Sequence, residues 1–277
     1  MMKLAINYSP QATELLAEGT IDIDLFKCAD WPEIVEPARK VKPIYVHFPV
    51  RAGDPQYAND FARVQDWKMR TQTTYVNMHL SAPESSYPGI PFDARDGQHI
   101  ARITANMITQ VREATALFGA QKVIVENLPT QQLTEDPGDA RELIIAVLPQ
   151  TIAAVIRETQ CNLLFDIDHA RVSAETLGIS LQDYVAELPM ERLRELHMTG
   201  THRLPDGRRQ SHLPMMEDDW EVFEWALQQI AAKKWSQPDI FAFEYGGIGP
   251  KFDWRTDKAV IAEQVPRLRK MMDEVLQ

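Results

Sequence analysis

Residues 162–174 read NLLFDIDHARVSA, an apolar run that ends in two carboxylates and a histidine. Four to eight apolar residues in a row are typical of a strand buried on both faces, as in a parallel sheet covered by helices. Burying a lone carboxylate at the end of such a strand costs several kcal/mol unless a partner compensates its charge. The charged end of this run, Asp166, Asp168 and His169, therefore marks a candidate site.

Seven further runs of this kind recur along the chain at helix-length intervals. The eight predicted strands are Lys3–Asn7, Asp22–Lys27, Ile44–Pro49, Thr74–Leu80, Lys122–Asn127, Asn162–Asp168, Leu193–Thr199 and Ile240–Tyr245. Amphipathic helical patterns are clearest at Ile100–Phe118, Ala140–Glu158, Asp218–Lys233 and Ala259–Leu276. Eight strands alternating with helices predict an α/β fold, the closed (β/α)8 TIM barrel. An open doubly wound sheet is the structural alternative, but the chain has no GxGxxG or Walker motif.

The bulk properties predict one domain over residues 1–277, since no linker or low-complexity tract divides the chain. A net charge of −11 weighs against nucleic acid as a partner. Cys28 and Cys161 lie in apolar stretches and are predicted to be reduced core thiols. The sequence shows no signal peptide and no run of 18 apolar residues, so we expect no membrane span and a cytoplasmic location.

Histidines and carboxylates recur where the predicted strands end. The histidines are His47, His79, His169, His197 and, in the loop beyond the seventh strand, His212; the carboxylates are Glu126, Asp166, Asp168 and Glu244. A barrel brings the carboxyl ends of its strands together at the face where active sites are built. Imidazole and carboxylate without thiolate suit zinc, iron, manganese or cobalt. Up to eight candidate ligands exceed the need of one ion, so the pattern predicts two or three metal ions.

Two long loops follow predicted strands, at Ser81–Gln98 and Thr201–Met215. The second carries a basic group that we interpret as a candidate substrate-binding clamp: His202, Arg203, Arg208 and Arg209. Guanidinium groups bind anionic groups through paired hydrogen bonds. A solvated surface loop is the alternative interpretation of the same residues.

Several short motifs together resemble one family of metal enzymes. They are His47, His79, VENLP at 125–129, LLFDIDHARVSA at 163–174, ELHMTG at 195–200, SHLPM at 211–215 and FEYGG at 243–247. The set resembles the multinuclear non-haem iron-dependent oxidases, barrel enzymes of the xylose isomerase-like superfamily that modify cysteines in ribosomally made peptides, as in methanobactin biosynthesis. The resemblance implies a peptide or small-molecule substrate.

The resemblance also implies a ligand set for iron. Its members would be His47, His79, Glu126, His197, His212 and Glu244, with His169 as a further ligand and Asp166 supporting or joining it. The chain departs from the family pattern at two positions. His169 stands where the family usually has Asn, and Gln210 stands where it usually has Asp.

Other functions remain open at this point. Sugar isomerases and epimerases of the same superfamily need one divalent ion, held by Glu126, Asp166 or His169, His197 and Glu244. Endonuclease IV, a trinuclear zinc enzyme, has a similar layout, but it too expects Asp at position 210. A barrel that binds metal and ligand without catalysis is a further alternative. Iron is favoured over zinc and manganese only through the family resemblance.

Overall fold

The computed structural model describes the chain except for residues 1, 131–140, 206, 208 and 277. A nine-stranded sheet forms its centre, and every pair of neighbouring strands in it is parallel. In spatial order, its strands are β3 (Ile44–His47), β2 (Leu25–Ala29), β1 (Lys3–Asn7), β11 (Ile240–Phe243), β8 (Leu193–Met198), β7 (Asn162–Asp166), β6 (Val123–Asn127), β5 (Val76–Leu80) and β4 (Arg51–Ala52).

The two edge strands of this sheet, β3 and β4, are consecutive in the chain and are separated by only three residues. The sheet must therefore curl until its two ends meet in one stretch, residues 44–52. The later part of that stretch bonds β5 through its backbone, with His79 N donating to Val50 O at 2.8 Å. The earlier part is linked only through side chains: Phe48 N donates to Asn77 Oδ1 at 2.7 Å. Nine strands thus occupy the eight positions of the predicted α/β barrel, and the predicted fold is confirmed.

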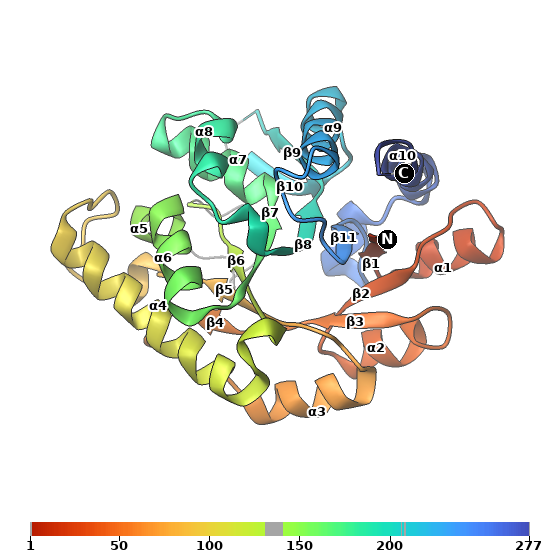
Figure 1. Ribbon diagram of the computed structural model, residues 1–277. Coiled ribbons are helices and arrows are strands. Elements are labelled where there is room, and N and C mark those ends of the chain that lie inside the picture. Colours follow the sequence, from red (N-terminus) through yellow and green to blue (C-terminus); the bar gives the residue numbers. More distant parts are fainter. Residues whose placement is uncertain (1, 131–140, 206, 208, 277) are drawn as a thin grey trace.

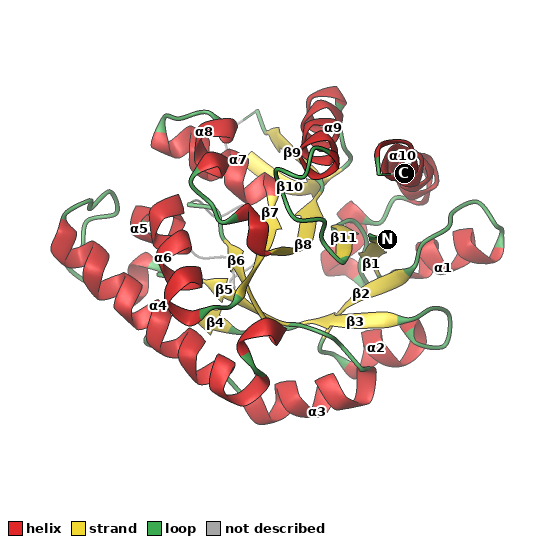
Figure 2. Ribbon diagram, viewed as in Figure 1, coloured by secondary structure: helices red, strands yellow, loops and turns green. Residues whose placement is uncertain are grey.

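Helices surround the curled sheet (Figures 1 and 2). The α-helices are α1 (Pro10–Ala17), α2 (Pro32–Ala38), α3 (Phe61–Thr71), α4 (Gly97–Phe118), α5 (Ile144–Val147), α6 (Pro149–Thr159), α7 (Ile167–Leu177), α8 (Leu181–Ala186), α9 (Glu217–Ala231) and α10 (Lys258–Val275). Short 3-10 turns are η1 (Glu84–Ser86), η2 (Ala120–Lys122), η3 (Met190–Arg192) and η4 (Pro250–Arg255).

The helix α4 illustrates why these segments are helical. Asp96 caps its first turn by accepting a hydrogen bond from His99 N. Ile103, Met107 and Val111 recur every four residues and are buried against the sheet. The four predicted helices are found within a few residues of their expected bounds. One of them is divided into α5 and α6 because Pro149 begins a new helix, and its predicted first residue, 140, lies outside the described residues.

Several predicted strands are found with shifted bounds, such as Asp22–Lys27, which is Leu25–Ala29, and two differences bear on the site. The sixth predicted strand ends at Asp166, not Asp168, because the Asp166 side chain accepts a hydrogen bond from His169 N and so caps α7. The loop predicted at Thr201–Met215 contains an antiparallel hairpin of β9 (Gly200–Arg203) and β10 (Arg209–Leu213). Its strands are polar and lack the apolar alternation that predicts a strand.

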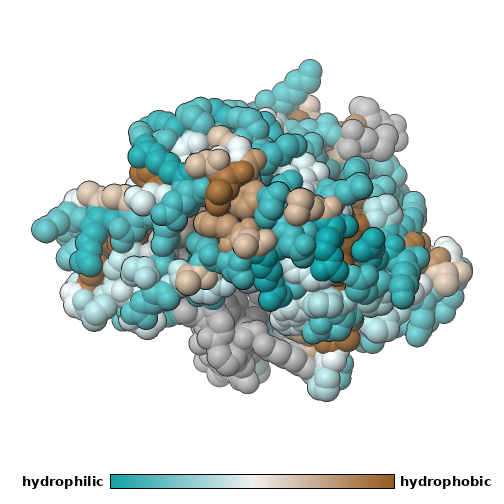
Figure 3. Space-filling model, turned by 90° about the horizontal axis from the view of Figure 1, so that it is seen from below, coloured by the Kyte–Doolittle hydropathy of each residue, from teal (hydrophilic) through white to brown (hydrophobic). Residues whose placement is uncertain are grey.

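The outer surface is predominantly polar on the face drawn in Figure 3, where apolar side chains gather only in small separate areas. Both Cys28 and Cys161 are buried and unpaired, as predicted. Within the described part of the chain, none of the helices combines the length and apolar composition needed to cross a bilayer.

Candidate metal centre

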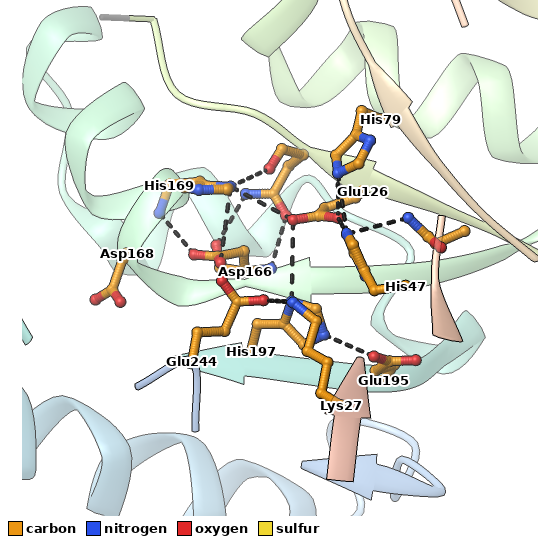
Figure 4. A network of polar contacts seen from close by, with 12 residues as sticks. Lys27, His47, His79, Glu126, Asp166, Asp168, His169, Glu195, His197 and Glu244 are labelled. Atoms are coloured by element: carbon orange, nitrogen blue, oxygen red, sulfur yellow. Dashed lines mark hydrogen bonds and ion pairs between the residues drawn. The ribbon is translucent and has the colours of Figure 1, made fainter. Parts of the chain in front are cut away.

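Most of the predicted ligands converge at the carboxyl ends of the strands (Figure 4). A cavity of about 310 Å³ lies there. Its walls include six of the eight predicted ligands: His47, His79, Glu126, His169, His212 and Glu244. The other two, Asp166 and His197, are not among the lining residues and are buried, with exposed fractions of 2% and 0%. The barrel therefore brings together side chains from seven separate places in the sequence.

Three donor atoms point at one another at the edge of this cavity. His47 Nε2 lies 3.0 Å from His79 Nε2, and the two nitrogens lie 3.3 Å and 3.2 Å from Glu126 Oε2. Donors about 2.1 Å from an ion in tetrahedral coordination are about 3.4 Å apart. Glu126 Oε2 is buried and makes no hydrogen bond. The spacing and the unpaired oxygen both fit a cation held among the three side chains.

Hydrogen bonds outside the cluster set the tautomers of four histidines. The Nδ1–H groups of His79, His169 and His212 donate to the backbone oxygens of Val50, Asn127 and Glu244, at 3.0 Å, 2.9 Å and 3.0 Å. Each bond leaves the ring's Nε2 with a free lone pair. Metal-binding histidines are held in this way, with the second nitrogen bonded to a carbonyl or carboxylate.

His197 uses the opposite tautomer. Its Nε2–H donates to Glu195 Oε1 at 2.6 Å, so the lone pair is on Nδ1. That nitrogen is buried, makes no hydrogen bond and faces Glu244 Oε1 at 2.8 Å. A lone pair facing a carboxylate oxygen is repulsive unless a cation lies beside both. This pair is therefore a second position at which a positive charge is required.

A third set of donors surrounds the start of α7. Glu126, Asp166 and His169 offer ligand atoms that all lie within 4.8 Å of one another. The same holds for His47, Glu126 and His197, and for Asp166, His197 and Glu244. Glu126 belongs to two of these groups, so its two oxygens can serve two neighbouring ions.

Burial controls the charge state of the cluster. It lowers the pKa of His47 well below its ordinary value, helped by the positive charge of Lys27. It lowers the pKa of His212 in the same way, with help from Arg255. Burial opposes ionisation of Glu126, but the adjacent His79 and His47 outweigh it and hold the pKa of that carboxyl well below its usual range. Neutral imidazoles beside an ionised carboxylate are the forms that bind metal.

His212 reaches the centre through an irregularity in the hairpin. The pairing of β9 with β10 shifts register between Gln210 and Leu213, and His212 has a φ of 58°. Left-handed backbone is rare for residues other than glycine, although histidine adopts it more often than most. Bulges of this kind redirect side chains near active sites. Gln210 itself pairs with His202 across the hairpin.

The basic residues of the hairpin that the structure describes, His202, Arg203 and Arg209, do not line the cavity at the strand ends. Arg203 and Arg209 both pair with Glu175, and Arg209 Nε lies 2.7 Å from its carboxylate. His202 Nε2 lies 2.8 Å from Pro214 O. Arg208 lies outside the described residues. The interpretation of these four residues as a substrate clamp remains a prediction.

A separate acidic cluster lies beneath the hairpin, where His202, Asp218 and Asp219 offer grouped ligand atoms. Arg171 already pairs with both carboxylates, at 2.7 Å from Asp218 and in closer contact with Asp219. The guanidinium occupies one oxygen of each carboxylate and offsets one of their two negative charges, so this cluster is a weaker candidate than the centre at the strand ends.

Five charged residues at the centre were not predicted from the sequence: Lys27, Arg51, Glu142, Glu195 and Arg255. Lys27 on β2 contacts the Glu244 carboxylate, and burial lowers the pKa of this lysine to about 8 against the opposing effect of Glu126. Glu195 orients His197, as described above. Its position was open to prediction, since residues two apart on a strand share a face. Glu142 lies in the cavity wall and accepts hydrogen bonds from Ser81 and Ala82.

Asp168 has a structural role instead of a place among the ligands. Its Oδ2 accepts hydrogen bonds from Thr199 N at 2.6 Å and Thr199 Oγ1 at 2.9 Å. Burial, followed by the charge of Asp166, raises the pKa of Asp168 to about 7. The residue thus ties the start of α7 to the end of β8.

Comparison with known sequences confirms the family resemblance. Residues 99–235 match the model of a family described as RiPP precursor modification enzyme MbnB/TglH/ChrH. A UPF0276 protein of Acaryochloris marina is 23% identical over 80% of this chain and 74% of its own length. A UPF0276 protein of Paraburkholderia phytofirmans is 36% identical over 50% of this chain and 42% of its own length. A third, from Bordetella pertussis, is matched over 29% of its length.

Solved structures confirm the barrel class. A D-tagatose 3-epimerase-like protein superposes with a TM-score of 0.58 at 13% identity, covering all of both chains. An L-ribulose 3-epimerase gives 0.56 at 14% identity, over 100% of this chain and 96% of its own. A xylose isomerase-like TIM barrel protein from Mycobacterium smegmatis, solved in complex with magnesium, gives 0.54 at 13% identity, over 100% and 98%. At such identities the likeness concerns the fold alone.

Proposed function

Starting from the match of residues 99–235 to the RiPP precursor modification enzymes, we propose that this chain is an iron-dependent oxidase that modifies a cysteine in a peptide substrate. The observation that carries the proposal is the number and arrangement of donors. Five histidines and three carboxylates converge at one end of the barrel, more than one ion can use.

The donor set fits iron chemically. Imidazole nitrogens and carboxylate oxygens suit ferrous iron, and the described cluster includes no thiolate. Bound at these donors, iron would supply redox chemistry with O₂ and an open coordination position for a substrate thiolate. Iron is favoured over zinc and manganese by the family match, because the donors themselves suit all three.

The chain's own residues would bind and orient the substrate. The cavity leads from the surface to His47 and His79, whose side chains are 16% and 20% exposed, whereas His197 is fully enclosed. A substrate group would therefore approach from the side of His47 and His79. Arg51 and Arg255 lie in the cavity wall, where positive charge would favour an anionic group such as a peptide carboxylate or a thiolate.

The proposal is tested with anaerobically iron-loaded protein and a set of cysteine-containing peptides. We expect oxygen uptake that depends on the peptide, and a mass change on the cysteine-bearing fragment. A matched peptide with serine in place of cysteine should give neither. Peptide-independent oxygen uptake with unmodified cysteine, across the set, would count against the proposal.

A sugar epimerase is the second candidate, favoured by the barrel likeness to an L-ribulose 3-epimerase. A single divalent ion at Glu126, Asp166, His197 and Glu244 would leave His47 and His79 to contact substrate. Exchange of solvent deuterium into a ketose would favour this candidate. Cleavage of an abasic duplex by zinc-loaded protein would instead favour the hydrolase alternative.

A further inference from the structure

Lys27 is a buried cation inside the candidate metal centre. It lies on β2, paired with Asn7 of β1 and Tyr45 of β3, and only 8% of the residue is exposed. Its side chain rises beside His197 toward Glu244 in Figure 4. A lysine is rarely enclosed in this way unless an acidic partner offsets the cost of burying its charge.

The partner of Lys27 is an oxygen that a metal ion would also use. Lys27 Nζ contacts Glu244 Oε1, the same atom that faces His197 Nδ1 at 2.8 Å. Asp166, His197 and Glu244 form one of the three donor groups at the centre. The positive charge required beside His197 and Glu244 is therefore already provided by the ammonium group.

The other two donor groups are not occupied in this way. Around Glu126, the contacts are with histidines: His47 and His79 at 3.3 Å and 3.2 Å on one oxygen, and His169 at 3.7 Å on the other. A neutral imidazole beside a carboxylate adds no positive charge, so a metal ion can still bind between them. An ammonium group on the carboxylate already supplies the positive charge that a metal ion would provide. A metal ion placed at Glu244 Oε1 would also be repelled by the adjacent ammonium.

We propose that Lys27 is a built-in cation that occupies the Asp166–His197–Glu244 position and limits the centre to two metal ions. The two ions would share Glu126, one on the side of His47 and one on the side of Asp166 and His169. This inference rests on the proposed function only in requiring that the cluster binds metal. Beyond the proposed function, it gives the number of metal ions in the centre and names Lys27 as the residue that sets this number.

The test counts ions and needs no substrate. Wild-type protein and Lys27 variants are loaded anaerobically with excess Fe²⁺, freed of unbound metal by gel filtration and analysed for metal and protein content. We expect two ions per chain in the wild type and three in Lys27→Met, which keeps the length of the side chain without its charge. Lys27→Arg retains the charge and should bind two.

Lys42→Met is the matched control, because Lys42 forms an ion pair with Asp22 at 3.5 Å, away from the centre. It should bind two ions. Three ions in the wild type, or two in a folded Lys27→Met protein, would overturn the inference while leaving the metal centre intact. If Lys27→Met fails to fold, as judged by circular dichroism, Lys27→Gln replaces it. The number of ions bound by the wild type still tests the limit of two. No bound metal in any protein would overturn the proposed function as well.

Discussion

At the scale of single residues, metal binding depends on groups that orient the ligands. Glu195 holds His197 by accepting a hydrogen bond from its Nε2 at 2.6 Å, which leaves the Nδ1 lone pair for the donor group that His197 forms with His47 and Glu126. Replacing such a partner commonly lowers metal affinity by about 10- to 100-fold. We expect Glu195→Gln to weaken metal binding within that range, measured by competition with a chelator of known affinity.

Glu191→Gln is the control for this variant, since Glu191 is exposed and precedes the same strand. It should leave the affinity unchanged. An unchanged affinity in Glu195→Gln would mean that the charge of Glu195 does not support metal binding, because the glutamine oxygen can still accept the hydrogen bond from Nε2.

Glu142 gives the protein a dependence of stability on pH. Burial raises the pKa of this carboxyl to about 8 in the folded protein, against an ordinary value of about 4.3. Between these values the folded state holds more protons than the unfolded state, so the stability due to protonated Glu142 is lost as the pH rises toward and through 8.

Glutamine stays neutral, so Glu142→Gln should lose less stability than the wild type between pH 5 and pH 9. The difference should be on the order of 1 kcal/mol or more, because each unit of pKa shift corresponds to about 1.4 kcal/mol. Urea denaturation at several pH values measures it, with exposed Glu84→Gln as the control. Parallel pH profiles for wild type and Glu142→Gln would contradict the expected protonation.

At the scale of elements, the junction of α7, β8 and the hairpin positions His212. The Thr199 hydroxyl donates to Asp168 Oδ2 at 2.9 Å and accepts from His212 N at 3.2 Å. Thr199→Val keeps the shape and removes both bonds, at an expected cost of about 1–3 kcal/mol in the free energy of unfolding. Thr199→Ser keeps the hydroxyl and should retain most of the wild-type stability. Denaturation of metal-free protein is the measurement, and equal stability of the Val and Ser variants would be the contrary result.

The elements also show where sequence patterns succeed. Apolar runs such as Val123–Val125 and Leu163–Phe165 are buried on both faces of the sheet, so strand and barrel were predictable from hydrophobic pattern alone. The hairpin was not, because its strands are short and polar and their pairing depends on contacts such as Arg209 with Glu175, 34 residues away. The two-part stretch that closes the barrel, β3 and β4, was predicted only in its first half.

The candidate site could be predicted from the sequence because the barrel could be predicted. Once the strand ends are known to meet, His47, His79, Glu126 and Glu244 must lie near one another. Lys27 was not predicted because a lone lysine in a strand normally points to solvent. Only the folded structure shows that its side chain points into the barrel. The clamp residues were chosen for charge alone, which does not show where their partners lie.

At the scale of the whole molecule, metal binding should stabilise the fold. Buried carboxylates such as Glu126 and Asp166 repel one another until cations compensate them. A ligand that binds only the folded state at 100 times its Kd adds about 2.7 kcal/mol. We expect ferrous iron to raise the Tm of chelator-treated protein by several degrees, measured anaerobically by calorimetry. Metal that leaves the Tm unchanged would show that the cluster does not bind it in the folded state.

Whether the strand ends hold an iron centre is tested by the iron content of the whole protein after anaerobic loading, determined together with its Mössbauer spectrum. We expect two iron ions per chain, with spectra that show nitrogen and oxygen ligation and magnetic coupling between the two ions. Less than one iron per chain, with tightly bound zinc in its place, would contradict it.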